Sequence, residues 1–250
     1  MFEPNDEFEL IVLTNIGPEN RSAIVIDNFY KNPDEVRELC LSYHQTTDKE
    51  NPDLIAGLPG NKVYMETDEV SNKLKSIFLQ LCSEMPFWRK KFDAEVFERG
   101  WREKNNAFVC NVVNDKTLLG HPRGIIPHQD YYPKQNPISE KTQFASVIFL
   151  NTPEECKGGT DLFSYKGKTS LLRSNTYSIY RTEGEDNLPR QEVFRRLRTS
   201  IDNSSDWRVE KHFPMRYNRC ILYEADSLHS PILDIGMFTD YSRISQVLFM

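Results

Sequence analysis

The chain has 250 residues, of which 38% are hydrophobic and 27% are charged. This balance is typical of a globular protein with a hydrophobic core and argues against disorder. The formal net charge of −6 offers no basic surface for nucleic acid, and no apolar run is long enough to span a bilayer. We therefore expect neither a nucleic-acid partner nor a membrane partner.

The N-terminus and the cysteines favour a cytoplasmic protein. The opening MFEPNDEFELIVL is acidic and lacks the layout of a signal peptide. Among five scattered cysteines, Cys40, Cys82 and Cys220 stand within apolar patterns typical of buried thiols. An odd count without short spacings disfavours both a disulfide framework and a zinc knuckle. The oligomeric state stays open.

The first hundred residues predict one strand and two helices. SAIVIDNFY (22–30) is typical of a short strand that ends in a turn. Asn32 can then cap a helix that has Pro33 at its first position. A second helix fits 68–85, where apolar residues recur on one stripe. We expect residues 1–106 to form a mostly helical scaffold outside a sheet.

From Ala107 onward the pattern changes to short strands rich in β-branched and aromatic residues. They are AFVCNVVN (107–114), QFASVIFLN (143–151), KTSLLR (168–173), TYSIYR (176–181), NRCILYEA (218–225) and RISQVLFM (243–250). A further helix fits 189–201, with its apolar residues aligned. The sequence therefore predicts a mainly β, α+β protein, with a sandwich or barrel in one domain spanning 1–250.

A His-x-Asp pair, His128 and Asp130, follows the apolar pair of GIIP. Residues two apart in an extended segment point the same way, so both side chains can face one metal ion. Iron(II) oxygenases commonly bind their metal through two histidines and one carboxylate. The alternative is a polar turn that leaves a strand.

The third ligand is sought among the other histidines. His44 ends the first predicted helix, His121 lies in a loop, and no apolar strand leads into His212. His229 differs, because the strand NRCILYEA leads into a short turn just before it. His229 is therefore the candidate, against the alternative of a core histidine with an ordinary hydrogen-bond partner.

The last strand predicts a buried cation. Its alternate residues Arg243, Ser245, Val247 and Phe249 share one face, so Arg243 and Ser245 should point inward with the two apolar residues. A buried arginine is costly unless an anion pairs with it. A ligand carboxylate suits the guanidinium fork, and a protein carboxylate such as Asp226 or Asp240 is the alternative.

In this order, His128-x-Asp130, His229 and Arg243-x-Ser245 resemble the motif of the Fe(II)/2-oxoglutarate-dependent oxygenases. SVIFLNTPEECKGGTDLF (146–163) is similar to a segment of the prolyl-hydroxylase-like and phytanoyl-type members. We expect Gly158–Gly159 itself to form an ordinary hairpin turn, after which Thr160 and Phe163 re-enter the sheet. VIDNFYKNPDEVREL (25–39) and FPMRYNRCILYEADSLHSP (213–231) resemble an uncharacterised, partly phage-encoded branch.

The resemblance implies a double-stranded β-helix, or cupin-like jelly roll, with its core in 107–250. It implies that His128, Asp130 and His229 bind Fe(II), and that Arg243, Ser245 and Asn111 bind 2-oxoglutarate. Val113 stands where relatives often have a tyrosine. With O2, such an enzyme hydroxylates an unactivated C–H bond and releases succinate and CO2, with desaturation or ring closure as the alternative reactions. The cofactor supplies the chemistry, so no catalytic residue is expected beyond the metal centre.

The substrate is the least determined part. Tyr131 and Tyr132 follow the His-x-Asp pair and are candidates to line the entrance, although only one of two consecutive residues can face inward. The polar segment 180–212 is a candidate lid. A small metabolite is the first expectation, and a peptide or protein side chain is the second. A catalytically silent jelly-roll binding module is the alternative from another class, and Asp130 disfavours a halogenase, in which Gly or Ala replaces the carboxylate.

Overall fold

The computed structural model describes residues 2–47, 61–66, 68–104, 107–120, 122–130, 142–171 and 188–250. The strands are β1 (Glu9–Ile16), β2 (Arg21–Asp27), β3 (Asn61–Glu66), β4 (Ala107–Val113), β5 (Phe144–Phe149), β6 (Gly159–Tyr165), β7 (Trp207–Pro214), β8 (Cys220–Glu224), β9 (His229–Ile232) and β10 (Arg243–Phe249). The helices are α1 (Pro33–Thr47), α2 (Asp68–Glu84), α3 (Ala94–Lys104), α4 (Asp115–Gly120) and α6 (Arg190–Asp202), with short 3-10 turns η1 (Pro122–Ile125) and η3 (Pro153–Glu155).

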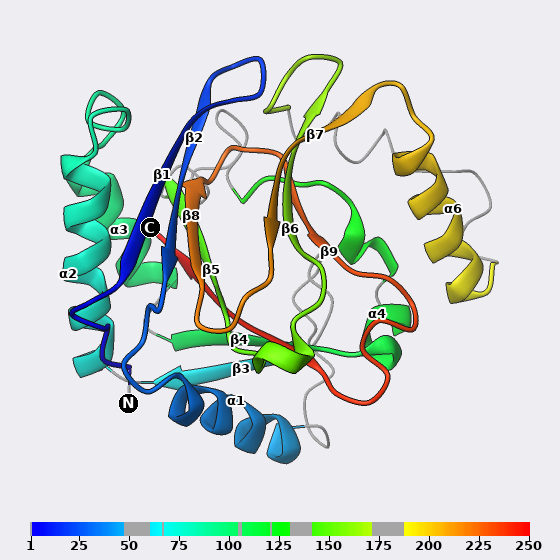
Figure 1. The fold of residues 1–250 in the computed structure, drawn as a ribbon, viewed down its shortest axis with the longest axis horizontal. Coiled ribbons are helices and arrows are strands. Elements are labelled where there is room, and N and C mark those ends of the chain that lie inside the picture. Colours follow the sequence, from blue (N-terminus) through cyan, green and yellow to red (C-terminus); the bar gives the residue numbers. More distant parts are fainter. Residues whose placement is uncertain are drawn as a thin grey trace.

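The described strands form two antiparallel sheets, which confirms a mainly β, α+β protein. The larger sheet has the order β1-β2-β8-β5-β10-β4-β3, and the smaller has the order β7-β6-β9. Figure 1 shows α2 and α3 beside the larger sheet, and α6 on the opposite side of the molecule, beyond the smaller sheet. The C-terminal strand β10 lies inside the larger sheet, paired with both β4 and β5.

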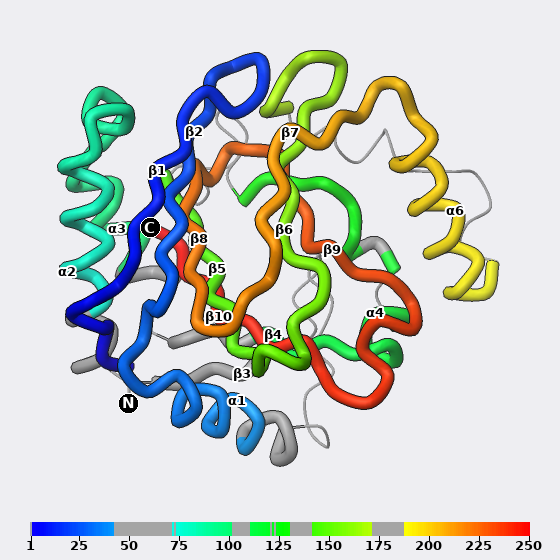
Figure 2. Tube along the Cα trace, in the orientation of Figure 1, coloured from blue at the N-terminus to red at the C-terminus, as the bar shows by residue number. Residues whose placement is uncertain are grey.

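Each face of the larger sheet is covered by a different hydrophobic cluster, because successive side chains of a strand point to opposite faces. On β10, Ile244 and Leu248 belong to the cluster shared with α1, α2 and α3. Val247 and Phe249 pack against the cluster shared with the smaller sheet and α6. Arg243 and Ser245 therefore lie on the face between the sheets, as the alternation predicts. The path of the strands can be followed in Figure 2.

The three predicted helices form close to their expected bounds. Pro33 is the first residue of α1, with acidic residues in the first turn, where both suit the helix N-terminus. The apolar stripe of α2 is buried through Leu74, Phe78 and Leu81. The stripe of α6 is buried through Val193, Phe194, Leu197 and Ile201. Residues 190–202 of the candidate lid are thus packed against the core, and residues 180–187 lie outside the described residues.

Several strand predictions need correction. Strands β1, β3, β7 and β9 were not predicted. Of these, β1 and β3 come from residues 1–106 and belong to the larger sheet. Residues 168–171 form no ladder strand, since Lys168 makes only an isolated bridge to Tyr165. The remainder of that predicted strand, and the one predicted over 176–181, fall outside the described part of the chain.

The glycine pair 158–159 is not a hairpin turn, because β5 and β6 belong to different sheets. Gly159 starts β6 between β7 and β9, with φ at +149°. A Cβ there would lie 2.0 Å from the Phe213 carbonyl oxygen, and one at Gly158 would lie 2.4 Å from that of Ile232. Glycine is required because the backbone approaches so closely at both positions.

The cysteines follow the prediction in part. Cys82 and Cys220 are buried free thiols, and burial raises the pKa of Cys82. Cys40 is buried but disulfide-bonded, so the prediction of a thiol there is wrong, and the cysteines no longer support a cytoplasmic location. Within the described ranges, none of the helices combines the length and the apolar character needed to cross a membrane.

Candidate metal centre

The three predicted ligands come together between the two sheets. His128 lies in the segment after η1, and His229 is the first residue of β9. The two residues form an antiparallel bridge, in which each N–H donates to the carbonyl oxygen of the other at 2.8 Å. The N–H of Asp130 donates to the carbonyl oxygen of Ala225 at 2.9 Å. Backbone pairing thus brings His128 and His229, which are 101 residues apart in sequence, to one place.

The side chains of this triad face one another. Their candidate ligand atoms all lie within 4.8 Å of one another. The imidazole centroids of His128 and His229 are 4.5 Å apart, and His229 Nε2 lies 3.4 Å from Asp130 Oδ2. Two nitrogen donors and one carboxylate on one side of a point leave its other side open, which is the donor set of a facial triad.

Hydrogen bonds set the tautomer of both histidines. Nδ1 of His128 lies 2.9 Å from the carbonyl oxygen of Ile126, and Nδ1 of His229 lies 2.9 Å from that of Ser227. A carbonyl oxygen can only accept, so Nδ1 of each neutral ring carries the proton and Nε2 keeps its lone pair. His128 Nε2 is buried and has no hydrogen-bond partner among the described residues. This arrangement is typical of histidines that bind a metal.

Burial also keeps His128 in the form that a metal needs. Burial, together with neighbouring His229, lowers the pKa of His128 to about 4, against the opposing effect of Asp130. A neutral ring at neutral pH has its lone pair available, whereas a protonated ring would have to lose a proton first.

The predicted cation is buried on the same side of the larger sheet. Arg243 is 4% exposed and Ser245 is 2% exposed, and Nη1 of Arg243 donates to Ser245 Oγ at 2.8 Å. The guanidinium carbon lies 5.5 Å from the centroid of the Phe149 ring. Burial lowers the pKa of Arg243 to about 10, so the group still carries its charge at neutral pH.

No carboxylate of the described residues forms an ion pair with Arg243. Of the two protein alternatives, Asp226 pairs with Arg21 instead, and Asp240 is exposed at the surface. Nε of Arg243 is buried without a hydrogen-bond partner in the part of the chain that the structure describes. A buried cation in this condition is costly, and an anionic ligand would remove that cost.

Two further polar side chains accompany Arg243. Asn111 of β4 lies directly opposite Ser245 of β10, so the two side chains share a face, and Asn111 Oδ1 is buried without a partner among the described residues. Tyr223 of β8 was not predicted. Its ring lies 4.8 Å from that of His229, and its hydroxyl interacts electrostatically with both Asp130 and Arg243. Tyr223 therefore lies beside His229 on the face between the sheets.

Alternation along β8 was the available signal for Tyr223, since it places Tyr223 and Ile221 on the inter-sheet face. The predicted substrate residues Tyr131 and Tyr132 lie outside the described residues, as does His121. His212 is on β7, half-exposed, with Nδ1 2.8 Å from Asp161 Oδ1. The imidazole of His212 pairs with Asp161, and no contact with the triad is found among the described residues. His212 is therefore not part of the site.

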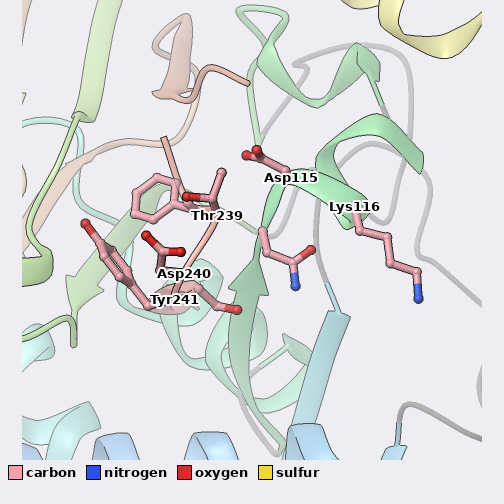
Figure 3. A pocket seen from close by; sticks show the side chains of 8 residues that line it. Asp115, Lys116, Thr239, Asp240 and Tyr241 are labelled. Carbon is pink, nitrogen blue, oxygen red and sulfur yellow. The ribbon is translucent and has the colours of Figure 1, made fainter. Parts of the chain in front are cut away.

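A surface pocket of about 420 Å³ lies where β4 ends and β10 begins (Figure 3). It is lined by Asn114, Asp115, Lys116, Phe238, Thr239, Asp240, Tyr241 and Ser242. None of the three ligand residues lines it. Asp115 Oδ2 accepts a hydrogen bond from the N–H of Gly236 at 2.9 Å, so this carboxylate helps to hold α4 against the loop before β10.

Fold and site together define a mainly β protein with a candidate His–Asp–His metal centre between two sheets. The chain belongs to a protein family of unknown function, DUF6445, whose model matches residues 10–239. That span contains all three candidate ligands and ends before Arg243. A search of curated proteins gave no match.

Proposed function

We propose that the protein is an Fe(II)- and 2-oxoglutarate-dependent dioxygenase that hydroxylates an unactivated C–H bond of a small metabolite. One observation carries the proposal. Two imidazole Nε2 atoms and one carboxylate converge between the sheets, and a buried arginine on the same side has no carboxylate partner among the described residues. A metal ion held by the triad could bind the 2-oxo acid end of a dicarboxylate co-substrate, and the arginine could pair with its distal carboxylate.

The strand order supports a double-stranded β-helix. From β4 the chain passes to the His128 bridge beside β9, returns to β5, passes to β6 and β7, returns to β8, passes to β9, and ends in β10. It thus alternates between the larger and the smaller sheet. Jelly rolls are built from two such sheets of antiparallel strands with Greek-key connections.

The donor set fits Fe(II). Two imidazoles and one carboxylate, with the opposite positions open, are the ligands of non-haem Fe(II) oxygenases. The carbonyl oxygens of Ile126 and Ser227 orient both rings, as outer-shell acceptors do in metal sites. Because Asp130 supplies a carboxylate at the third position, the centre favours hydroxylation over halogenation.

The chain also offers a binding site for 2-oxoglutarate. Its distal carboxylate would accept hydrogen bonds from the Arg243 guanidinium and from Ser245, with the Phe149 ring beneath the guanidinium. Asn111, on the facing position of β4, offers an amide to the same ligand. When bound, iron supplies the oxidative decarboxylation of 2-oxoglutarate with O2, which gives succinate, CO2 and the oxidant for the substrate.

Three tyrosines are proposed to exclude bulk water from the reaction or to contact the ligands. Tyr223 is fully buried beside His229, and its raised pKa keeps the hydroxyl protonated, as a hydrogen-bond donor. Tyr131 and Tyr132 remain candidates to contact the substrate. A small metabolite is the proposed substrate, ahead of a peptide or protein side chain.

Succinate formation tests the proposal. The protein, reconstituted with Fe(II), is incubated with 2-oxoglutarate and a panel of metabolites and peptides. We expect one class of compound to raise succinate release in the wild type, and we expect His128→Ala, Asp130→Ala and His229→Ala each to abolish it. His212→Ala is the control, since this histidine pairs with Asp161 on β7.

Two results would count against the proposal. The first is a wild-type protein that binds Fe(II) but forms no succinate with any compound or without one. The second is a His229→Ala variant that retains iron affinity and turnover while His212→Ala loses them.

A further inference from the structure

We infer that Arg21 is a positioning residue for the metal centre, because it holds the turn over 225–228 that orients Asp130 and His229. The inference rests on the proposed function only in taking His128, Asp130 and His229 as metal ligands. It does not depend on 2-oxoglutarate or on the substrate.

The turn between β8 and β9 carries two of the acceptors that shape the triad. The carbonyl oxygen of Ala225 accepts from the N–H of Asp130 at 2.9 Å. That of Ser227 lies 2.9 Å from His229 Nδ1 and accepts its proton. The turn is closed by the N–H of Ser227, which donates to the carbonyl oxygen of Glu224 at 2.9 Å. A shift of this turn therefore moves two ligands at once.

Arg21 binds this turn on both sides of Ala225. Its Nη1 donates to Glu224 Oε2 at 2.6 Å and to Asp226 Oδ1 at 2.6 Å, and its Nη2 donates to Asp226 Oδ2 at 3.1 Å. The two-point contact with Asp226 fixes the plane of that carboxylate as well as its distance. One guanidinium thus joins the last residue of β8 to the turn that follows.

A third contact reaches the other end of the turn. Nε of Arg21 donates to Thr169 Oγ1 at 2.8 Å, and the carbonyl oxygen of Thr169 accepts from the N–H of Leu228 at 2.7 Å. Thr169 is itself held by Glu19, which accepts from both its hydroxyl and its N–H. Every donor group of Arg21 named here leads to residues 224–228 directly or through Thr169.

The sheet explains why a residue so far away in sequence reaches the turn. β2 and β8 are antiparallel, with Ala23 opposite Tyr223, so Arg21 lies two residues further along, across from Ala225. Its side chain is buried with that of Glu224. A buried arginine held by two carboxylates has few alternative positions, which makes it suited to fix a turn.

The other end of the same strand pair provides a matched control. Arg219, the residue before β8, is buried and donates to Asp27, the last residue of β2, at 2.5 and 2.6 Å. Asp27 and Asp226 are both largely buried, with side-chain exposures of 19% and 27%. Both carboxylates meet a buried arginine at two points. Among the described residues, no hydrogen bond of Arg219 or Asp27 leads to the triad or its turn.

The experiment compares Asp226→Asn with Asp27→Asn in the full chain, using Co(II) as a spectroscopic probe of the metal centre. Each substitution keeps the side-chain shape and removes one charge-assisted pair. We expect Asp226→Asn to weaken Co(II) affinity about tenfold, the lower end of the range for outer-shell changes. Asp27→Asn should change that affinity less than about twofold, while both variants lower the melting temperature.

Arg21→Lys is the second variant, because it keeps a cation beside Glu224 but cannot span both carboxylates. It should weaken Co(II) affinity at least as much as Asp226→Asn, whereas Arg219→Lys should not. Equal affinity in the wild type and folded Arg21→Lys would overturn the inference and leave the dioxygenase proposal standing. Tight Co(II) binding without succinate formation would overturn the dioxygenase proposal alone. A wild type without Co(II) binding would overturn both.

Discussion

The two faces of the larger sheet are both buried, yet they differ in what they bury. The face toward α1, α2 and α3 is covered by apolar side chains such as Ile244 and Leu248. Its buried polar pair is neutral: Tyr30 donates to Gln246 Oε1 at 2.5 Å, and Gln246 Nε2 has no partner among the described residues. The face toward the smaller sheet buries the charged Arg243, and also Asn111, whose oxygen has no partner among the described residues.

On the single strand β10, residues of one face therefore contribute to stability and residues of the other face to ligand binding. Successive residues of β10 alternate between the faces, so Arg243 and Ile244 are neighbours in sequence with different surroundings. Apolar burial stabilises the folded chain, whereas an unpaired buried cation destabilises it until an anion binds. Variants on the two faces should therefore fail in different ways.

Leu248→Ala sharpens the comparison from the helix side. It removes a fully buried side chain next to α2 and α3 and should lower the free energy of unfolding by about 2–5 kcal/mol. The variant protein that remains folded should keep the wild-type affinity for Fe(II) and 2-oxoglutarate. Denaturant unfolding and anaerobic ligand titration measure the two quantities. A large loss of affinity in the folded fraction would show that the faces are coupled.

Arg243→Ala should have the opposite pattern. Truncating one partner of a charge-assisted pair in a dry pocket costs about 2–5 kcal/mol, so the 2-oxoglutarate concentration for half-maximal succinate formation should rise about 30-fold or more. Stability of the ligand-free protein should not fall, because the buried charge is removed with its cost. An unchanged half-saturation would remove the main reason for proposing 2-oxoglutarate.

Ser245→Ala tests the same face with a smaller change. The hydroxyl accepts from Arg243 and would offer one neutral hydrogen bond to the ligand, worth about 1 kcal/mol. The half-saturating 2-oxoglutarate concentration should rise about fivefold, with Fe(II) affinity unchanged. An effect as large as that of Arg243→Ala would mean that Ser245 acts by holding Arg243 in place.

The smallest effect is expected from Asp27→Asn, as a change in pH dependence. Hydrogen bonds from Arg219 lower the pKa of Asp27 below its ordinary 3.8, against the effect of burial. The carboxylate therefore stabilises the fold fully above pH 3.8, and this contribution is lost as pH falls through the lower folded-state pKa. In Asp27→Asn the melting temperature should fall less steeply below pH 3.8. An identical slope would exclude Asp27 as a contributor.

The sequence predicts best those features that depend on the residue pattern within a single strand or helix. The inward direction of Arg243 and Ser245 follows from the period of two, and the buried stripes of α2 and α6 follow from helical spacing. The triad was predicted from the order of its residues. In contrast, β1 has exposed Ile11 and Val12 without clean alternation, and β9 contains Pro231, so neither has a local strand signal.

Features that depend on pairing between distant segments could not be predicted. Arg21 has no local pattern, and its partners Glu224 and Asp226 lie 203 and 205 residues away. Their meeting depends on the register of β2 and β8. Tyr223 likewise becomes a neighbour of His229 only after the chain turns back at 225–228. The positions of Tyr131 and Tyr132 relative to the triad stay a prediction.

The most direct test of the account is anaerobic absorption spectroscopy of the Fe(II) protein during titration with 2-oxoglutarate. Chelation of iron by 2-oxoglutarate produces a weak visible charge-transfer band, so the proposed site predicts a saturable band in the wild type. The band should be absent in His229→Ala, and in Arg243→Ala it should saturate only at about 30-fold higher 2-oxoglutarate. A wild-type protein that binds Fe(II) and shows no such band at saturating 2-oxoglutarate would contradict the account.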